Sequence, residues 1–311
     1  MINAEIKLLI MLAKRYLRAD KEIRKKIQEQ GINLIPENFY SNIPSLANIE
    51  NSFEYRDTDS APYNSPQVFN PEVMRGFMSV LSQYASEFEP PKEGDKENPQ
   101  SFFWGNPAFS YSDAMSYYCV LRHFKPAQVL EIGSGFSTLV ADQALKKNGN
   151  GSLILIEPYP KLFLRKLETV SSVHEKFVQD ISIRMLIDLI EASDVWFIDS
   201  THTVKIGSDC LYIYLKAMPE VKKDIIVHAH DIFLPFAFRK EWASDRQLYW
   251  TEQYLLYAYL LDNPKIEVLF GSTYANAFFP SELKSLMGGK YPCGGGSLWY
   301  RLNGTIERNM N

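Results

Sequence analysis

Short apolar runs alternate with helical patterns along the chain from about residue 126 onward. A short apolar run bounded by polar or turn residues is typical of a buried strand, whereas apolar residues spaced three or four apart are typical of a helix that faces a core. Strand-like runs fall at 128–133, 152–157, 175–179, 195–199 and 224–231. Helical patterns fall between them at 137–147, 161–170, 183–191 and 207–218. Strands that are separated by helices predict a parallel sheet with helices on both faces.

The pattern changes near the C-terminal end. After a helix expected at 248–261, two more strand-like runs follow at 266–272 and 297–303, and the glycine-rich stretch YPCGGGS precedes the second of them. A closing pair of strands after the alternating ones predicts a seven-stranded, mostly parallel α/β sheet whose last strand is inserted antiparallel. Right-handed crossovers then place the C-terminal ends of the parallel strands along one edge of that sheet.

The first 26 residues predict a basic amphipathic helix. Apolar positions at helical spacing are followed by a series of lysines and arginines. The apolar run at 8–13 is much shorter than the roughly 20 residues that a membrane span requires, and no small-residue cleavage site follows it. Such a helix can lie on an anionic membrane or bind a partner, but most amphipathic helices pack on their own domain, so we favour packing.

The next part of the chain is irregular. Residues 31–107 are rich in Pro, Asn, Ser and Asp, and only 71–88 has a helical pattern. The polar stretch EPPKEGDKENPQ at 89–100 is typical of a loop or linker. We therefore expect a helical and irregular cap over 1–100 and an α/β domain over 101–311.

Composition narrows the class of ligand and the compartment. The 311 residues are 46% hydrophobic and 23% charged, with a net charge of −4, which is ordinary globular usage. No cluster of lysine and arginine is dense enough for nucleic acid, so a small-molecule substrate is favoured. Three scattered cysteines without a CxxC argue against a zinc knuckle or a disulfide framework and indicate a cytoplasmic protein. The oligomeric state stays open.

The C-terminal ends of the first three strands indicate a nucleoside site, because open α/β sheets bind ligands there. The glycines of EIGSGFST let the backbone approach a ligand closely, and the start of the following helix favours an anionic group such as a carboxylate. The stretch lacks the third glycine of a dinucleotide-binding motif. Glu157 ends the second strand, where a carboxylate can accept both ribose hydroxyls, and Asp180 follows the third, where it can meet an adenine amino group. The three ends predict a pocket for an adenosine that carries a sulfonium and an amino-acid tail.

These motifs resemble a known family. EIGSGFST, the acidic end of IEP, the QD after the third strand and the final GGSLWYRL resemble a class I S-adenosylmethionine-dependent methyltransferase, which has a Rossmann-like sheet. FIDSTHTVKIGSD, IIVHAHDIFLPF and WTEQYLL resemble the methyltransferase domain 24 subgroup, and the resemblance covers about residues 100–303. It implies a donor site made of Glu131, Gly133, Ser134, Gly135, Phe136, Ser137, Glu157, Asp180 and Asp199. The alternative roles are a loop cap for Glu131 and a helix N-cap for Asp180.

The fourth and fifth strand ends carry a second set of polar residues. Asp199, His230 and Asp231 are expected at one edge of the sheet, where they could bind one divalent ion. Carboxylate and imidazole suit Mg²⁺, Mn²⁺ or Fe²⁺, and imidazole favours the transition metals. Some O-methyltransferases of this fold use an aspartate and an acidic pair at these places, from which His230 departs. The alternative is a hydrogen-bonded cluster without metal, and His228, which lies deeper in the strand, is expected to be structural.

The predicted activity is O-methylation of a small-molecule hydroxyl, such as that of a sugar, a polyketide or another specialised metabolite. His202, His230 and Asp231 are the catalytic candidates, with His202 as the base that takes the hydroxyl proton. Two alternatives remain open. A metal-dependent oxygenase would use the aspartate and two histidines as an iron site, and a non-catalytic scaffold would bind a nucleoside without turnover.

Overall fold

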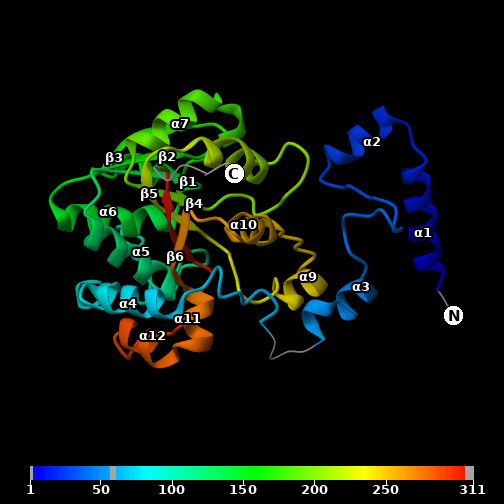
Figure 1. The fold of residues 1–311 in the computed structure, drawn as a ribbon. Coiled ribbons are helices and arrows are strands. Elements are labelled where there is room, and N and C mark those ends of the chain that lie inside the picture. Colours follow the sequence, from blue (N-terminus) through cyan, green and yellow to red (C-terminus); the bar gives the residue numbers. More distant parts are fainter. Residues whose placement is uncertain (1–2, 57–60, 305–311) are drawn as a thin grey trace, which may run out of the picture. The chain divides into compact units, whose positions relative to one another are not determined.

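The computed structural model describes residues 3–56 and 61–304. Spatial contacts divide the chain into two compact units, Met1–Arg56 and Asp57–Asn311. The larger unit contains the whole sheet and all of the predicted site residues (Figure 1). None of the described helices is both long enough and apolar enough to cross a membrane.

The described residues of the first unit form helices and no strand. The helices are α1 (Ala4–Leu17), α2 (Lys21–Gln28), α3 (Leu46–Glu50) and the 3₁₀ turn η1 (Phe53–Tyr55). The single basic helix expected over the first 26 residues is therefore two helices. The break occurs because Asp20 acts as the N-cap of α2, where its side chain accepts the N–H of Ile23. Most large apolar side chains of α1 are exposed.

The second unit is built on a seven-stranded sheet. Its strands are β1 (Gln128–Ile132), β2 (Ser152–Ile156), β3 (Val170–His174), β4 (Val195–Ile198), β5 (Asp224–Ala229), β6 (Ile266–Gly271) and β7 (Leu298–Asn303). They lie in the order β3-β2-β1-β4-β5-β7-β6, and β7 runs in the direction opposite to the other six strands of this sheet. The predicted mostly parallel sheet with an antiparallel last strand is confirmed.

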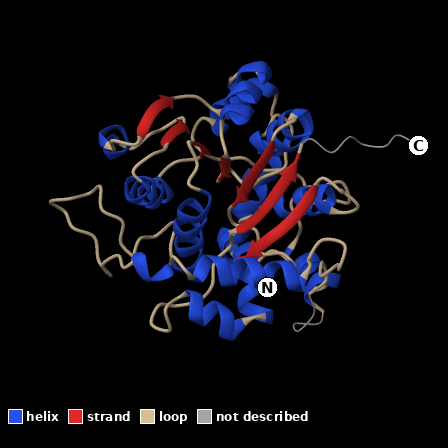
Figure 2. Ribbon diagram, turned by 60° about the vertical axis from the view of Figure 1, so that its left-hand side comes forward, coloured by secondary structure: helices blue, strands red, loops and turns tan. Residues whose placement is uncertain are grey.

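Helices cover both faces of this sheet (Figure 2). The longer ones are α4 (Pro71–Ser82), α5 (Tyr111–Phe124), α6 (Phe136–Asn148), α7 (Ile183–Ala192) and α10 (Glu252–Leu260). The shorter ones are η2 (Ala85–Glu87), η3 (Leu162–Lys166), η4 (Val178–Asp180), α8 (Asp209–Tyr212), η6 (Met218–Glu220), α9 (Lys240–Arg246), α11 (Ser272–Phe278) and α12 (Pro280–Leu286). Between α8 and η6, the expected helix at 207–218 contains a π-helical turn, η5 (Ile213–Ala217).

The third strand was predicted wrongly. It was expected at 175–179, but β3 occupies 170–174, and residues 178–180 form the turn η4. The helix expected at 161–170 is also shorter than predicted. Only the 3₁₀ helix η3 forms there, and the last residue of the expected helix, Val170, begins β3. Because β3 is an edge strand that pairs only with β2, it is half-buried, and its sequence VSSVH mixes two valines with serine and histidine instead of forming an apolar run.

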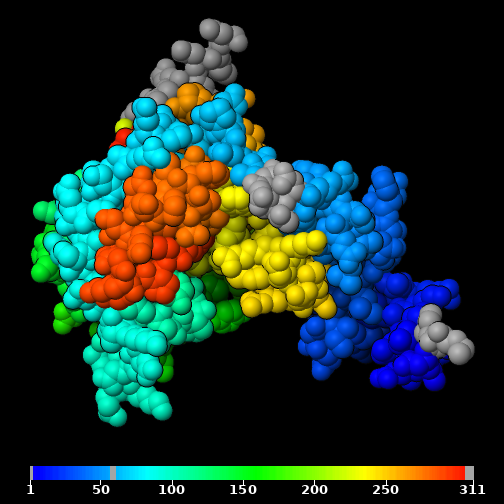
Figure 3. All heavy atoms as spheres, turned by 90° about the horizontal axis from the view of Figure 1, so that it is seen from below, coloured from blue at the N-terminus to red at the C-terminus, as the bar shows by residue number. Residues whose placement is uncertain are grey.

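The division between the two units lies at Arg56, not at the residue 100 expected from the sequence. The difference arises because α4 packs against α5 and α12 (Figure 3) and shares the core of the sheet. Met74 and Leu81 of α4 are 0% exposed. Burying a side chain of this size stabilises the fold by about 2 kcal/mol, so this helix is an integral part of the α/β unit.

Candidate active site

The turn after β1 fits tightly against the end of β4. Gly133 has a φ of +82°, and a Cβ atom built there would lie 1.8 Å from the backbone oxygen of Asp199. Both facts require glycine at this position. The backbone N–H of Ser134 donates to Glu157 Oε2 at 3.1 Å, which ties the same turn to the end of β2.

Glu131 supports this turn from inside the core. Its side chain is 0% exposed and accepts hydrogen bonds from the Tyr117 hydroxyl at 2.7 Å and from Thr138 Oγ1 at 2.6 Å. Thr138 Oγ1 in turn accepts the N–H of Gly135 at 3.1 Å. Burial raises the pKa of Glu131 to about 7, although the two hydroxyl donors act in the opposite direction. Through Thr138, Glu131 therefore stabilises the loop that follows β1. This contact corresponds to the loop cap named above as its alternative role.

We expect Glu131 to make folding stability depend on pH. Its pKa rises from an ordinary value of 4.5 to about 7 on folding, so stability is full below pH 4.5, falls as the pH rises to 7, and is then constant. Glu131→Gln should remove this loss and gain about 2 to 3 kcal/mol relative to wild type between pH 5 and pH 8. Urea unfolding of both proteins at pH 5 and at pH 8 measures the gain. If the free energy of unfolding of Glu131→Gln differs from that of wild type by the same amount at both pH values, the prediction is wrong. The exposed Glu168→Gln is the control.

A cavity of about 200 Å³ lies over the turn. It is lined by Ala108, Phe109, Gly133, Ser134, Gly135, Phe136, Ser137, Glu157, Lys161 and Asp199. All of the predicted donor-site residues line it except Glu131, which is below the turn, and Asp180, which is exposed at the end of η4. No sequence motif marked the loop residues Ala108, Phe109 and Lys161.

One polar atom in this cavity has no partner. The side-chain oxygen of Ser134 is buried and makes no hydrogen bond within the described part of the chain. Buried hydroxyl groups are nearly always hydrogen-bonded, and because Ser134 lines the cavity, a water or a ligand there would be in a position to supply the missing hydrogen bond. Glu157 can also accept a ligand, because each of its oxygens uses only one lone pair on a backbone N–H.

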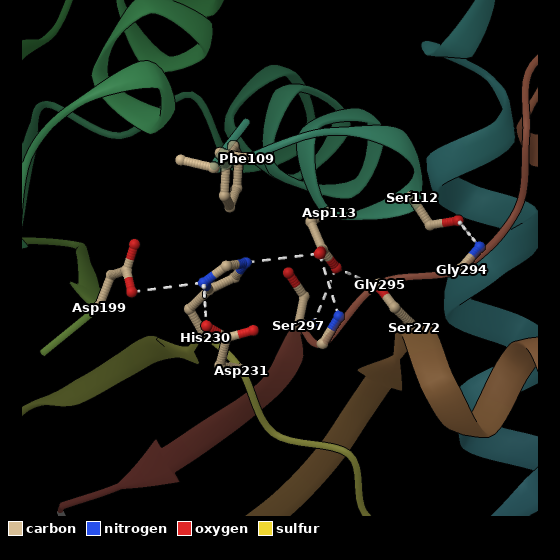
Figure 4. A network of polar contacts seen from close by, with 12 residues as sticks. Phe109, Ser112, Asp113, Asp199, His230, Asp231, Ser272, Gly294, Gly295 and Ser297 are labelled. Carbon is tan, nitrogen blue, oxygen red and sulfur yellow. Dashed lines mark hydrogen bonds and ion pairs between the residues drawn. The ribbon is translucent and has the colours of Figure 1, made fainter. Parts of the chain in front are cut away.

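The fourth and fifth strands bring the predicted metal ligands together. Asp199 follows β4 and the pair His230–Asp231 follows β5, and one ligand atom from each lies within 4.8 Å of the others. The Nδ1 atom of His230 lies 3.3 Å from Asp199 Oδ1 and 3.7 Å from Asp231 Oδ2 (Figure 4). Phe109 packs on the His230 ring and also lines the cavity, so the cluster adjoins the cavity through Phe109 and Asp199.

His202 joins the same cluster. Its Nε2 lies 3.2 Å from Asp199 Oδ1 and 3.6 Å from Asp231 Oδ2, while its Nδ1 lies 2.9 Å from Glu252 Oε2. His202 and Asp231 have φ values of +58° and +52°. Each such residue costs about 1 kcal/mol or more and persists only where its surroundings hold it, as is common at functional sites.

Negative charge dominates the cluster. Burial by itself would lower the pKa of both histidines, but the neighbouring carboxylates outweigh it, raising that of His202 to about 10 and that of His230 well above its ordinary value. The carboxylates at this site therefore favour a positive charge at its centre.

The two carboxylates behind the histidines, Asp113 and Glu252, lie almost fully buried. Asp113 accepts hydrogen bonds from Ser272, Gly296 and Ser297 and faces His230 Nε2 at 3.4 Å. Glu252 accepts the Tyr214 hydroxyl at 2.7 Å. The sequence analysis assigned no such role to either residue. Two signals were available: the motif WTEQYLL contains Glu252, and the GGG before β7 forms a turn that closes on Asp113.

His228 stays apart from the cluster. Its ring is fully buried between Phe197 and Trp299, and its Nε2 shares a 2.8 Å hydrogen bond with Ser297 Oγ. Burial holds the pKa of His228 well below its ordinary value, which keeps the ring neutral. This arrangement agrees with a structural role.

The sheet order, the glycine turn after β1 and the acidic residues after β2 and β4 define a class I methyltransferase fold. Residues 130–232 match the family model described as a methyltransferase domain. An uncharacterized protein of Archaeoglobus fulgidus is 31% identical over 145 residues, which cover 45% of this chain. The chain spans 64% of the length of that relative.

Solved structures of methyltransferases are also similar to this chain. An O-methyltransferase from Bacillus cereus, solved in complex with SAH, is 11% identical, with a TM-score of 0.38 over 76% of this chain and 92% of that one. The O-methyltransferase TomG from Streptomyces achromogenes, involved in tomaymycin synthesis and solved with SAM, is 13% identical, with a TM-score of 0.35 over 76% and 91%. Neither likeness bears on the acceptor of this chain.

Proposed function

We propose that the protein transfers a methyl group from S-adenosylmethionine to a hydroxyl oxygen of a small organic molecule in the cytoplasm. The observation that carries the proposal is the cavity that runs from the glycine turn to Asp199, where it meets the histidine and aspartate cluster. The donor, when bound, supplies an electrophilic methyl group on a sulfonium. Candidate acceptors are hydroxyls of sugars, polyketides or other specialised metabolites, and no nucleic-acid partner is expected.

The chain's own residues suit this donor. Gly133 and Gly135 let the backbone approach the ligand, and the orphan oxygen of Ser134 offers a further polar contact. Glu157 can accept ribose hydroxyls with its free lone pairs. Asp180 remains the proposed partner of the adenine. Asp199 closes the cavity on the side of the cluster, where the acceptor would bind.

The cluster suits a divalent cation. His230 is 6% exposed, and its Nδ1 faces two carboxylates while making no hydrogen bond within the residues described. Asp199, His230 and Asp231 would hold the ion. A bound cation supplies positive charge that lowers the pKa of an acceptor hydroxyl. The charge of the ion would also offset the carboxylates that keep His202 protonated, so His202 would accept the hydroxyl proton if three residues hold the ion, and would bind the ion itself if four do.

Donor binding is tested by isothermal titration with S-adenosylhomocysteine. We expect one site per chain, and Glu157→Gln should weaken binding about 10-fold or more, because a charged hydrogen-bond acceptor is lost. The exposed Glu168→Gln should bind like wild type. Absence of binding to the wild-type protein would overturn the methyltransferase proposal.

A second candidate activity follows from the same cluster. Two histidines and a carboxylate are also the ligands of non-haem iron oxygenases. Oxygen consumption by the Fe²⁺-loaded protein, with no transfer of label from methyl-labelled S-adenosylmethionine to a panel of hydroxylated acceptors, would favour an oxygenase. Donor binding without either activity would favour a non-catalytic scaffold.

A further inference from the structure

We propose that His202 is a fourth ligand of the metal centre, and that Glu252 and Asp113 orient the two histidines so that the site selects a first-row transition ion over Mg²⁺. The inference deepens the proposed function and rests on its metal site. It concerns which residues bind the ion and which ion they select.

The two histidines face the aspartates in the same way. The inward nitrogen of His202 lies 3.2 Å and 3.6 Å from Asp199 Oδ1 and Asp231 Oδ2, and that of His230 lies 3.3 Å and 3.7 Å from the same two atoms. Ligand atoms about 2.1 Å from a tetrahedral ion lie about 3.4 Å from one another. Both nitrogens therefore face the same two oxygens. Asp199, His230 and Asp231 already have ligand atoms within 4.8 Å of one another, and the His202 ring would approach the ion that these three residues hold.

The outward nitrogens of the histidines face buried carboxylates. His202 Nδ1 lies 2.9 Å from Glu252 Oε2, and His230 Nε2 lies 3.4 Å from Asp113 Oδ2. A carboxylate only accepts hydrogen bonds, so each pair keeps a ring N–H on the outward nitrogen, and a cation that displaces the proton of the inward nitrogen would meet a lone pair there. Metal-binding histidines usually have a carboxylate or carbonyl in this place, which fixes the tautomer and the ring orientation. Figure 4 shows this arrangement for His230.

Both carboxylates are themselves held in place. Asp113 is fixed by three donors, and a Cβ atom at Gly295 would lie 2.3 Å from its Oδ1, so the glycine turn closes directly on it. Glu252 is held by Tyr214, and its backbone N–H and that of Thr251 both donate to the carbonyl of His202. The second contact joins the start of α10 to the loop that carries His202.

The ligand set determines the type of ion. Mg²⁺ prefers oxygen ligands and keeps several waters, whereas imidazole suits manganese, iron, cobalt and zinc better. Two imidazoles and two carboxylates therefore favour a first-row transition ion. An acidic pair in place of His230–Asp231, with no His202, would favour Mg²⁺.

The proposal is tested on the full chain after removal of metals, by titration with Mn²⁺, Co²⁺, Zn²⁺ and Mg²⁺ separately. We expect one ion per chain, with Mg²⁺ binding at least about 100-fold more weakly than Zn²⁺. His202→Ala should weaken Co²⁺ binding about 100-fold and change the visible spectrum of the Co²⁺ protein. Glu252→Gln should weaken binding about 10- to 100-fold and shift the same spectrum, as expected for a residue that positions a ligand. His123→Gln, on a half-buried histidine at the end of α5, should change neither.

Each outcome decides one point. Unchanged Co²⁺ affinity and spectrum in His202→Ala would overturn the four-ligand centre and leave His202 as the base. Mg²⁺ binding as tightly as Zn²⁺ would overturn the selectivity. S-adenosylhomocysteine titration of the same samples reports separately on the methyltransferase proposal, and its retention in both variants shows that they are folded.

Discussion

Asp199→Asn is expected to impair both halves of the site at once. Asp199 lines the donor cavity and contacts His202 and His230, so its carboxylate serves the donor pocket and the metal cluster together. The amide has the same shape but lacks the charge and one acceptor. We expect Mn²⁺ affinity to fall about 100-fold and methyl transfer to fall about 10²- to 10⁴-fold, with a smaller loss of S-adenosylhomocysteine affinity.

Calorimetry with Mn²⁺ and with S-adenosylhomocysteine measures the two binding losses on one sample. Asp188→Asn, on an exposed carboxylate of α7, is the matched control and should bind both ligands like wild type. Full Mn²⁺ affinity in Asp199→Asn would show that the cluster does not use this residue as a ligand.

Gly133→Ala is expected to cause the largest loss of stability. The new Cβ would lie 1.8 Å from the backbone oxygen of Asp199, so β1 and β4 would have to separate at the site. Strain at a positive φ and a forced backbone shift together cost about 2 to 5 kcal/mol. We expect donor binding to be lost even where the variant still folds, because the displaced turn forms the floor of the cavity.

Gly149→Ala separates the two causes of that loss. Gly149 ends α6 with a φ of +74°, but a Cβ atom there would meet nothing within 4 Å. Its substitution should cost only the conformational part, about 1 kcal/mol. Urea unfolding of both variants measures the difference, and equal losses would show that close packing against Asp199 is not the reason for glycine at 133.

The sequence predicted the parts of the fold that depend on local patterns. The buried strands β1, β2, β4 and β5 are mostly apolar runs, so their ends and the residues that follow them could be located. The edge strand β3 could not, because half-buried positions tolerate serine. The sequence pattern also predicted a helix at 161–170 that is longer than η3. Apolar residues at helical spacing do not distinguish a helix from a loop whose apolar side chains pack on the core.

The carboxylates behind the histidines were not predictable, for a different reason. Asp113 and Glu252 each sit in the first turn of a helix, where an acidic residue is ordinary. Their partners lie far away in the sequence, and only the folded chain brings them together. Glycines 294–296 indicated that another group packs closely against the backbone there, but the sequence did not identify that group as Asp113.

The antiparallel direction of β7 has a consequence for the order of assembly. Leu298, at the start of β7, pairs with Ala229, at the end of β5. The glycine turn that precedes β7, the last strand along the chain, therefore lies next to the site. During synthesis, Asp113 therefore remains without its donors from Gly296 and Ser297 until these residues have left the ribosome. A nascent chain or one truncated before β7 would not hold His230 in place, so the proposed metal site should form only after β7 has joined the sheet.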